Sequence, residues 1–267
     1  MSNSELSVSI VTATFNSMRF FEKTKQSVFS AGVEGFEWIV VDDGSSDGTR
    51  EYLQTLTDPR IKVHLKERNT GIGDSYEIGV RLARGKYLLI LDHDDTIPGS
   101  SLIDRIDALE SHPESNVAFG TVAYMDEGDR IYQVSKFPFL KHSGLVPSAR
   151  VLAGVFFAPA YPLKQGCVVL RTAFVRTVPR IFDIALFLSG VRSGPVAFID
   201  QPCLNYRTFR NQFSSSRKMR LIKFFHFYWA RYAFQYLPWL VSVPVALYRT
   251  ALELAKVLWC FISPKRV

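Results

Sequence analysis

Three carboxylates stand within four consecutive positions of the segment GKYLLILDHDDTIPG, residues 85–99. Asp92, Asp94 and Asp95 come directly after an apolar run, with His93 between the first two. Clustered carboxylates repel one another unless a cation neutralises them, so this spacing predicts a site for a hard divalent ion. The alternative is a plain acidic turn in which Asp95 caps the following helix.

A second polar cluster, VVDDGSSDGT, spans residues 40–49. Gly44 permits a tight turn and the serines can cap a helix, so a well-capped turn is one interpretation. The other is a binding role, because the carboxylates of Asp42 and Asp43 could accept hydrogen bonds from a nucleobase imide or a ribose hydroxyl. A third cluster, NTGIG at residues 69–73, lacks the glycine spacing of a dinucleotide-binding loop.

The elements that must position these clusters alternate between short apolar runs and segments with helical spacing. Nearly continuous apolar strands separated by helices predict an α/β fold whose mostly parallel sheet is covered on both faces. In such sheets ligands bind beyond the carboxyl ends of the strands, where the polar clusters fall. The expected strands are residues 7–13, 37–42, 61–65 and 86–91, and the expected helices are 17–31, 72–84 and 101–111.

The order of these motifs, VSIVTATFNS, IVVDDGSSDGT, NTGIG and GKYLLILDHDD, resembles the nucleotide-binding half of the family 2 glycosyltransferases. The resemblance covers residues 7–99 and implies a GT-A fold, an inverting reaction and a nucleotide-diphosphate sugar as donor. A UDP-sugar is the first expectation, because a short base site lined by Asp suits a pyrimidine.

The resemblance also implies roles for individual residues. Asp92-His93-Asp94 corresponds to the family's D-x-D motif, with Asp94 as ligand of Mg²⁺ or Mn²⁺ and Asp92 near the ribose or a metal-bound water. His93 is then a spacer, since a hard cation has little use for imidazole. The base and ribose are expected to lie among Thr12, Thr14, Asn16, Asp42 and Asp43.

Family members carry a Glu-Asp pair whose Asp removes the proton of the acceptor hydroxyl. The corresponding stretch here is PRIFDIALFLSG, in which Phe182 replaces the Glu and Asp183 is the expected base. A helix cap is the alternative role for Asp183. Three other acidic residues, in the segment YMDEGD, fit a solvated hairpin turn better than a catalytic base: Asp126, Glu127 and Asp129.

A further match is LNYRTFRNQFSSS, which resembles the segment that closes the donor site in the family. Arg207 or Arg210 is expected to contact diphosphate oxygens, because the guanidinium geometry suits them. The alternative is that both are surface arginines on a loop.

Composition limits the class of protein. An apolar fraction of 47% excludes disorder, and three cysteines without a C-x-x-C pair favour a reducing compartment. The first residues do not read as a signal peptide, so we expect a cytoplasmic protein that begins where the sequence does. We expect a nucleotide-sugar-binding half at 1–115, an acceptor-side half of the same domain at 116–216, and a helical tail at 217–267.

The tail carries most of the positive charge. Residues 217–267 hold nine basic residues and one acidic residue, a net +8, whereas residues 1–216 hold 23 and 24, a net −1. On a helical wheel Arg217, Arg220, Lys223 and Arg231 share one side, as in a basic amphipathic helix. The next apolar run is 16 residues long and is interrupted by Pro238 and Pro244, whereas a spanning helix needs about 20.

We therefore expect the tail to lie on an anionic membrane surface, on the inner face of the membrane. Packing of the tail against the catalytic domain is the alternative. Nucleic acid is not expected as a partner, because no base-reading module is visible.

The sequence thus predicts an inverting glycosyltransferase that moves a sugar from a nucleotide-diphosphate sugar to the hydroxyl of a sugar or lipid-linked acceptor, in surface polysaccharide or glycolipid synthesis. Two alternatives stay open. A sugar nucleotidyltransferase would be expected to show a Gly- and Arg-rich phosphate loop, which residues 8–17 lack. A non-catalytic sugar-nucleotide-binding protein would fit the missing Glu.

Overall fold

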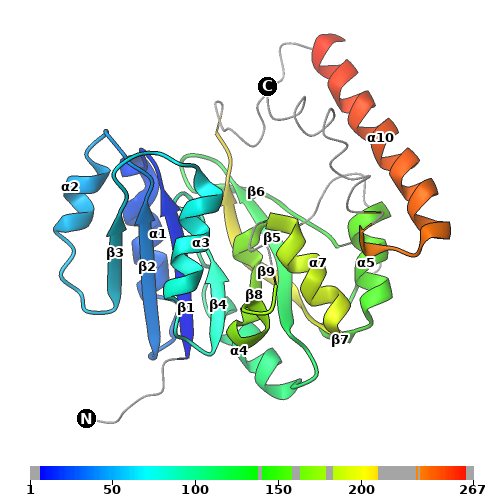
Figure 1. The fold of residues 1–267 in the computed structure, drawn as a ribbon, viewed down its shortest axis with the longest axis horizontal. Coiled ribbons are helices and arrows are strands. Elements are labelled where there is room, and N and C mark those ends of the chain that lie inside the picture. Colours follow the sequence, from blue (N-terminus) through cyan, green and yellow to red (C-terminus); the bar gives the residue numbers. More distant parts are fainter. Residues whose placement is uncertain are drawn as a thin grey trace.

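The computed structural model describes residues 7–137, 140–157, 163–178, 183–209 and 235–262, together with Ala233. Within these residues a nine-stranded sheet forms the centre of the molecule, in the order β3-β2-β1-β4-β8-β5-β9-β7 with β6 paired to β5 (Figure 1). The strands are β1 Val8–Thr14, β2 Phe36–Asp42, β3 Ile61–Leu65, β4 Tyr87–Ile90, β5 Val117–Met125, β6 Ile131–Val134, β7 Gly144–Val146, β8 Val168–Arg171 and β9 Val196–Arg207.

The first four strands are parallel, as the sequence predicts: β1 pairs with β2 and β4, and β2 pairs with β3. The sheet as a whole is mixed, because β8 runs antiparallel to both β4 and β5. The helices are α1 Met18–Phe29, α2 Thr49–Gln54, α3 Ile72–Leu82, α4 Ser101–Ser111, α5 Ser148–Phe157, α6 Thr172–Val175, α7 Asp183–Ser193 and α10 Trp239–Ile262, with a 3₁₀ turn, η1, at Gln165–Cys167.

Helices cover both faces of the sheet, and every residue of β1 is buried between them. On one face α3 approaches so closely that a Cβ at Gly79 would lie 2.3 Å from Cγ1 of Val11. On the other face the next residue, Thr12, accepts a hydrogen bond from Trp38, whose ring stacks on Phe21 of α1 at a centroid distance of 5.2 Å. Figure 1 shows α3 and α7 in front of the sheet and α1 behind it.

The two halves of the expected domain share this one sheet. Strand β8 from the second half lies between β4 of the first half and β5 of the second, and it is hydrogen-bonded to both. Strands from either side of residue 115 therefore belong to one continuous sheet. This agrees with the interpretation of residues 116–216 as an extension of the first sheet. The boundary positions themselves stay predictions.

The C-terminal helix α10 differs from the expected interrupted run. Pro238 precedes the helix, but Pro244 lies inside it, so the prediction of an interruption at Pro244 is wrong. A proline removes only one backbone donor, and here it lies in the second turn, next to the exposed residue Leu240. In the part of the chain that the structure describes, no helix combines the length and hydropathy of a membrane span.

Candidate active site

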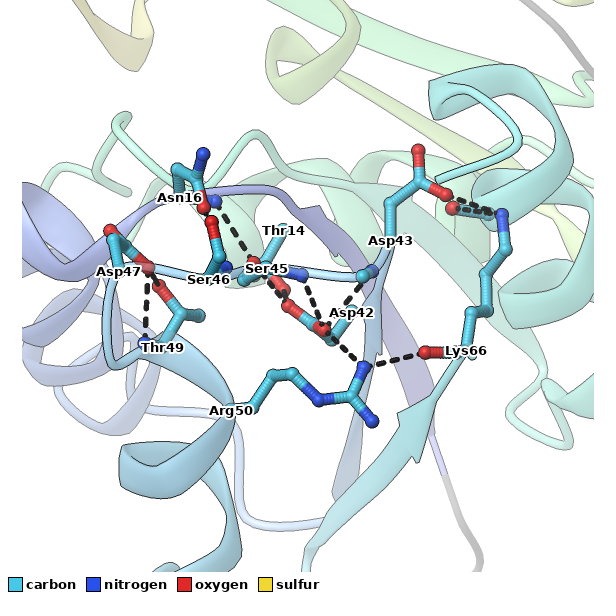
Figure 2. A network of polar contacts seen from close by, with 12 residues as sticks. Thr14, Asn16, Asp42, Asp43, Ser45, Ser46, Asp47, Thr49, Arg50 and Lys66 are labelled. Carbon is cyan, nitrogen blue, oxygen red and sulfur yellow. Dashed lines mark hydrogen bonds and ion pairs between the residues drawn. The ribbon is translucent and has the colours of Figure 1, made fainter. Parts of the chain in front are cut away.

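The ends of β1 and β2 meet at one rim, because the parallel register pairs Thr14 with Asp42. The hydroxyl of Thr14 donates to Oδ1 of Asp42 at 3.2 Å. The loops that follow these strands also contact each other: Asn16 N–H donates to Oγ of Ser45 at 2.9 Å, and Ser46 N–H donates to Oδ1 of Asn16 at 2.9 Å (Figure 2). Thr14 and Asn16 therefore lie at the rim as expected, with Asn16 exposed to solvent.

Asp42 builds the turn that follows β2. Its carboxylate is fully buried and accepts hydrogen bonds from the backbone N–H groups of Gly44 and Ser45 at 3.1 and 3.0 Å, and from Arg50 at 3.2 Å (Figure 2). Gly44 has a φ of +76°, and a Cβ there would lie 2.8 Å from N of Asn69. The expected tight turn at Gly44 is present, but Asp42 accepts its backbone hydrogen bonds, and neither serine caps α2, whose N-cap residue is Gly48.

Asp43 joins the turn to the NTGIG loop. Its carboxylate lies 2.6 Å from Nζ of Lys66 and accepts hydrogen bonds from the N–H groups of Thr70 and Gly71 at 2.9 and 3.0 Å. Lys66, which is 8% exposed, also pairs with Asp74 at 2.8 Å. The third cluster of the sequence is thus held against the second by two backbone hydrogen bonds to Asp43, beside the buried ion pair of Asp43 with Lys66.

Thr12 lies in the core and not at the rim. It is fully buried two residues before the end of β1, and its hydroxyl accepts a hydrogen bond from Nε1 of Trp38 at 2.9 Å. The expectation that Thr12 surrounds the base or ribose is corrected on this ground: its side chain points into the layer between the sheet and α1.

The acidic loop follows β4 at the same rim. Asp92 accepts a hydrogen bond from the hydroxyl of Tyr76 on α3, and Asp95 is fully buried with Oδ1 2.8 Å from the N–H of Arg207. Burial raises the pKa of Asp92, and the charge of Asp94 raises it further. Burial raises the pKa of Asp95 well above its ordinary value, again with contributions from the charges of Asp94 and Asp92.

Asp94 differs from the other rim carboxylates. It is 8% exposed, and among the described residues its carboxylate makes no hydrogen bond or ion pair, whereas Asp42, Asp43 and Asp92 all have partners. Oδ2 of Asp95 likewise accepts no hydrogen bond from the described residues. The loop therefore gathers carboxylates, of which Asp94 and Oδ2 of Asp95 have no partner among the described residues.

These features fit a hard divalent cation that takes only one or two ligands from the protein. No group of three or more His, Cys, Asp or Glu side chains that could hold a metal ion by itself occurs in the described ranges. Mg²⁺ is typically bound by one or two carboxylates together with substrate phosphates and water, so Asp94 with Asp92 is a sufficient protein contribution.

Arg207, at the end of β9, ties the acidic loop to a distant turn. The side chain is fully buried, its Nε donates to the backbone oxygen of Asp94 at 2.8 Å, and its Nη1 pairs with Oδ1 of Asp129 at 2.5 Å. The interpretation as a surface arginine on a loop is therefore wrong. In this structure the guanidinium of Arg207 contacts Asp94 and Asp129, so we assign it the role of positioning Asp94. Arg210 lies outside the described residues.

The turn at residues 126–129 is the hairpin that the sequence predicts, between β5 and β6. It is also fixed to α1, because Arg19 pairs with Glu127 and Lys23 pairs with Asp129. These acidic side chains are engaged in ion pairs, which favours a structural role over that of a catalytic base.

Replacing Arg207 with lysine is expected to lower the free energy of unfolding by about 2–4 kcal/mol, since an ammonium cannot reach both the acidic loop and the turn. Urea unfolding would measure the change. The matched control is Arg81→Lys, because Arg81 is exposed on α3 and its ion pair with Glu77 contributes little. Equal stability of the Arg207 and Arg81 variants would contradict the assignment.

Asp183 is the first residue of α7. Its side chain is not among those described, so both expected roles, catalytic base and helix cap, stay predictions. Phe182 lies outside the described residues.

Three residues at the rim were missed by sequence reasoning: Lys66, Tyr76 and Lys164. Lys66 directly follows β3, and a lysine at a strand end near two acidic clusters could have been recognised from the sequence as a partner for them. Tyr76 is a buried position of α3 with no local mark of its contact with Asp92. Lys164 lowers the pKa of Asp92 and Asp95 by its charge and lies 4.3 Å above the Tyr206 ring, which no sequence pattern indicates.

Fold and site together define an α/β protein with an acidic, nucleotide-type rim at the ends of its parallel strands. Residues 9–162 match the sequence model of the family described as Glycosyl transferase family 2. The chain belongs to this family of glycosyltransferases.

Relatives of known description agree with this assignment. TuaG of Bacillus subtilis strain 168, a glycosyltransferase assigned to teichuronic acid biosynthesis, is 28% identical over 81% of this chain and 85% of its own. Chondroitin synthase of Escherichia coli is 26% identical over 82% of this chain, but the match spans only 31% of that larger protein.

The fold is similar to that of S. aureus TarS 1–349, solved in complex with UDP-GlcNAc. The TM-score is 0.64 at 18% identity, over 83% of this chain and 66% of TarS 1–349. The expected GT-A fold is thereby confirmed.

Proposed function

We propose that this chain transfers a sugar from a UDP-sugar to an acceptor hydroxyl, with inversion at the anomeric carbon and with Mg²⁺ or Mn²⁺ held by Asp94 and Asp92. The observation that carries the proposal is the carboxylate of Asp94, which is 8% exposed and has no hydrogen bond or ion pair among the described residues, inside a cluster of carboxylates at the rim. Uncompensated negative charge of this kind suits a cation and the diphosphate that accompanies it.

The donor half of the site is supported by the rim of β1 and β2. Asn16 is exposed there and has a carbonyl oxygen and an amide nitrogen to offer to a base or ribose. Thr14, Asp42 and Asp43 lie beneath it and fix the loops in place. The UDP moiety is favoured because TarS, a protein of the same fold, was solved with UDP-GlcNAc and with UDP.

The reaction needs a base on the acceptor side, and Asp183 is our candidate. Its carboxylate takes the proton of the acceptor hydroxyl while the oxygen forms a bond to the anomeric carbon. The bond from that carbon to the diphosphate breaks at the same time, and the diphosphate leaves with the electron pair. A bound divalent cation would neutralise the charge that develops on this leaving group.

The acceptor is proposed to be a growing polysaccharide, as the descriptions of TuaG and chondroitin synthase suggest, or a lipid-linked sugar, as the proposed membrane location suggests. A peripheral location on an anionic membrane surface, on the cytoplasmic side, would bring the site near such an acceptor. The +8 charge of residues 217–267 supports this location, although residues 217–232 lie outside the described part of the chain.

Thermal unfolding in the presence of UDP-sugars and Mn²⁺ tests the donor assignment. A donor at 100 times its dissociation constant is expected to stabilise the protein by about 2.7 kcal/mol, which corresponds to a rise in melting temperature of about 5 °C or more. Chelation of the metal should remove the rise, and an ADP-sugar of the same sugar is the matched control. An equal rise with every nucleotide, or none with any UDP-sugar, would contradict the proposal.

A further inference from the structure

Helix α10 packs on the protein with a side that includes a buried arginine. The described buried positions of α10 are Ser242, Val245, Ala246 and Arg249. Arg249 is fully buried; its Nε donates to the backbone oxygen of Phe156 at 2.7 Å and its Nη2 to that of Val155. The arginine therefore binds free carbonyl groups in the last turn of α5, which fixes the rotation of α10 about its own axis.

The opposite side of α10 is apolar and faces outward. Leu240 and Leu247 are each 68% exposed, Val243 is 45% exposed and Leu254 is 42% exposed. Spacings of three, four and seven residues place these four on one side of an α-helix, and we call them the α10 stripe. Arg249, nine residues after Leu240, lies on the opposite side of the helix.

A helix on a water-exposed surface usually presents polar side chains outward, whereas α10 presents the apolar stripe. The exposed apolar surface continues onto α5 through Phe157, 46% exposed, whose ring lies 6.3 Å from that of Tyr248. The hydroxyl of Tyr248 donates to the backbone oxygen of Phe157 at 3.3 Å. Aromatic rings with one polar end are typical of the boundary between lipid and water.

Figure 1 shows α10 at the edge of the molecule beside α5, at the end opposite β3. Because Arg249 holds one side of α10 against α5, the stripe faces away from α5. A surface that contacts the stripe along its length must therefore run parallel to the helix axis.

We propose that the α10 stripe inserts shallowly into an anionic lipid leaflet, with α10 lying in the plane of the interface. This inference deepens the proposed membrane location and rests on it. Charge complementarity selects the occupant: residues 217–267 carry +8 and residues 1–216 carry −1, so an anionic leaflet attracts the part of the chain that bears the stripe. A second copy docked through α10 would instead bring two segments of +8 together.

Sedimentation of the full chain with vesicles tests the proposal. Vesicles of phosphatidylcholine with phosphatidylglycerol are expected to bind the protein, and Leu240→Gln/Leu247→Gln is expected to weaken binding by about tenfold or more for each leucine. The matched control is Leu82→Gln, since Leu82 is 45% exposed at the end of α3 and should leave binding unchanged. Both leucines of the stripe are exposed, so the double variant should unfold at the same temperature as the parent protein.

A second readout separates insertion from attraction by charge. Leu247→Cys carrying an environment-sensitive fluorophore is expected to show a blue shift of its emission when the anionic vesicles are added. Raised salt should reduce this shift only as far as it reduces the bound fraction of the protein. The same fluorophore on Leu82→Cys should show no shift. Undiminished binding of the double glutamine variant, or an unshifted label at 247, would overturn the proposal. So would a lipid-free dimer of the parent protein that the double variant loses.

The same variants distinguish this proposal from the proposed function. The rise in melting temperature with a UDP-sugar and Mn²⁺ should be equal in the parent protein and in Leu240→Gln/Leu247→Gln. If the double variant loses vesicle binding but keeps the rise in melting temperature, the result bears on the α10 stripe alone. If the parent protein shows no rise in melting temperature, the result contradicts the donor assignment and leaves the stripe proposal untouched.

Discussion

Replacing Asp94 with alanine is expected to abolish Mn²⁺-dependent binding of a UDP-sugar while leaving the fold intact. Its carboxylate has no hydrogen bond or ion pair among the described residues, so its removal breaks no contact that the structure shows. It also removes one of the charges that raise the pKa of Asp92 and Asp95. The free protein should therefore be as stable as the parent or more stable, because repulsion within the loop is relieved.

Thermal unfolding with and without Mn²⁺ and donor would measure both effects. If the affinity falls by about 100-fold, a donor that stabilises the parent by about 2.7 kcal/mol stabilises the variant by about 0.4 kcal/mol. Asp107→Ala is the matched control, because Asp107 is exposed on α4 and away from the rim. Metal-dependent donor binding that survives in Asp94→Ala would remove Asp94 from the metal site.

The arrangement of the first four strands could be predicted because β1, β2 and β4 are nearly continuous apolar runs and β3 is a short alternating one, and polar residues follow all four. Residues 61–65 and 101–111 were predicted with the bounds that the structure gives β3 and α4. Once these strands are parallel, their carboxyl ends must share an edge, so the meeting of Thr14 with Asp42 follows from the pattern alone.

The partners of the rim residues could not be predicted, because they come from distant parts of the chain. In a strand that is apolar on both faces, alternation does not tell which residue points where, so Thr12 was placed at the rim when it packs on Trp38. Arg207 was recognised as a candidate by its motif, but its contact with Asp129, 78 residues away, depends on the pairing of β5 with β9.

Asp183 presents a choice between two roles that a single substitution can separate. α7 begins at this residue, so its carboxylate can cap the helix, and the same carboxylate is our candidate for the base. Asparagine caps a helix about as well as aspartate but cannot take a proton at neutral pH. Alanine can do neither.

Asp183→Asn is therefore expected to lower the turnover number of sugar transfer by about 10² to 10⁴, the usual contribution of a general base, with little change in donor affinity or melting temperature. Asp183→Ala should lower turnover to the same extent and reduce the free energy of unfolding by about 1 kcal/mol as well, because the cap is lost. Steady-state kinetics, together with urea unfolding of both variants, would measure these quantities. If turnover is unchanged in the asparagine variant and only the alanine variant is destabilised, Asp183 is a cap, and the base must be sought elsewhere on the acceptor side.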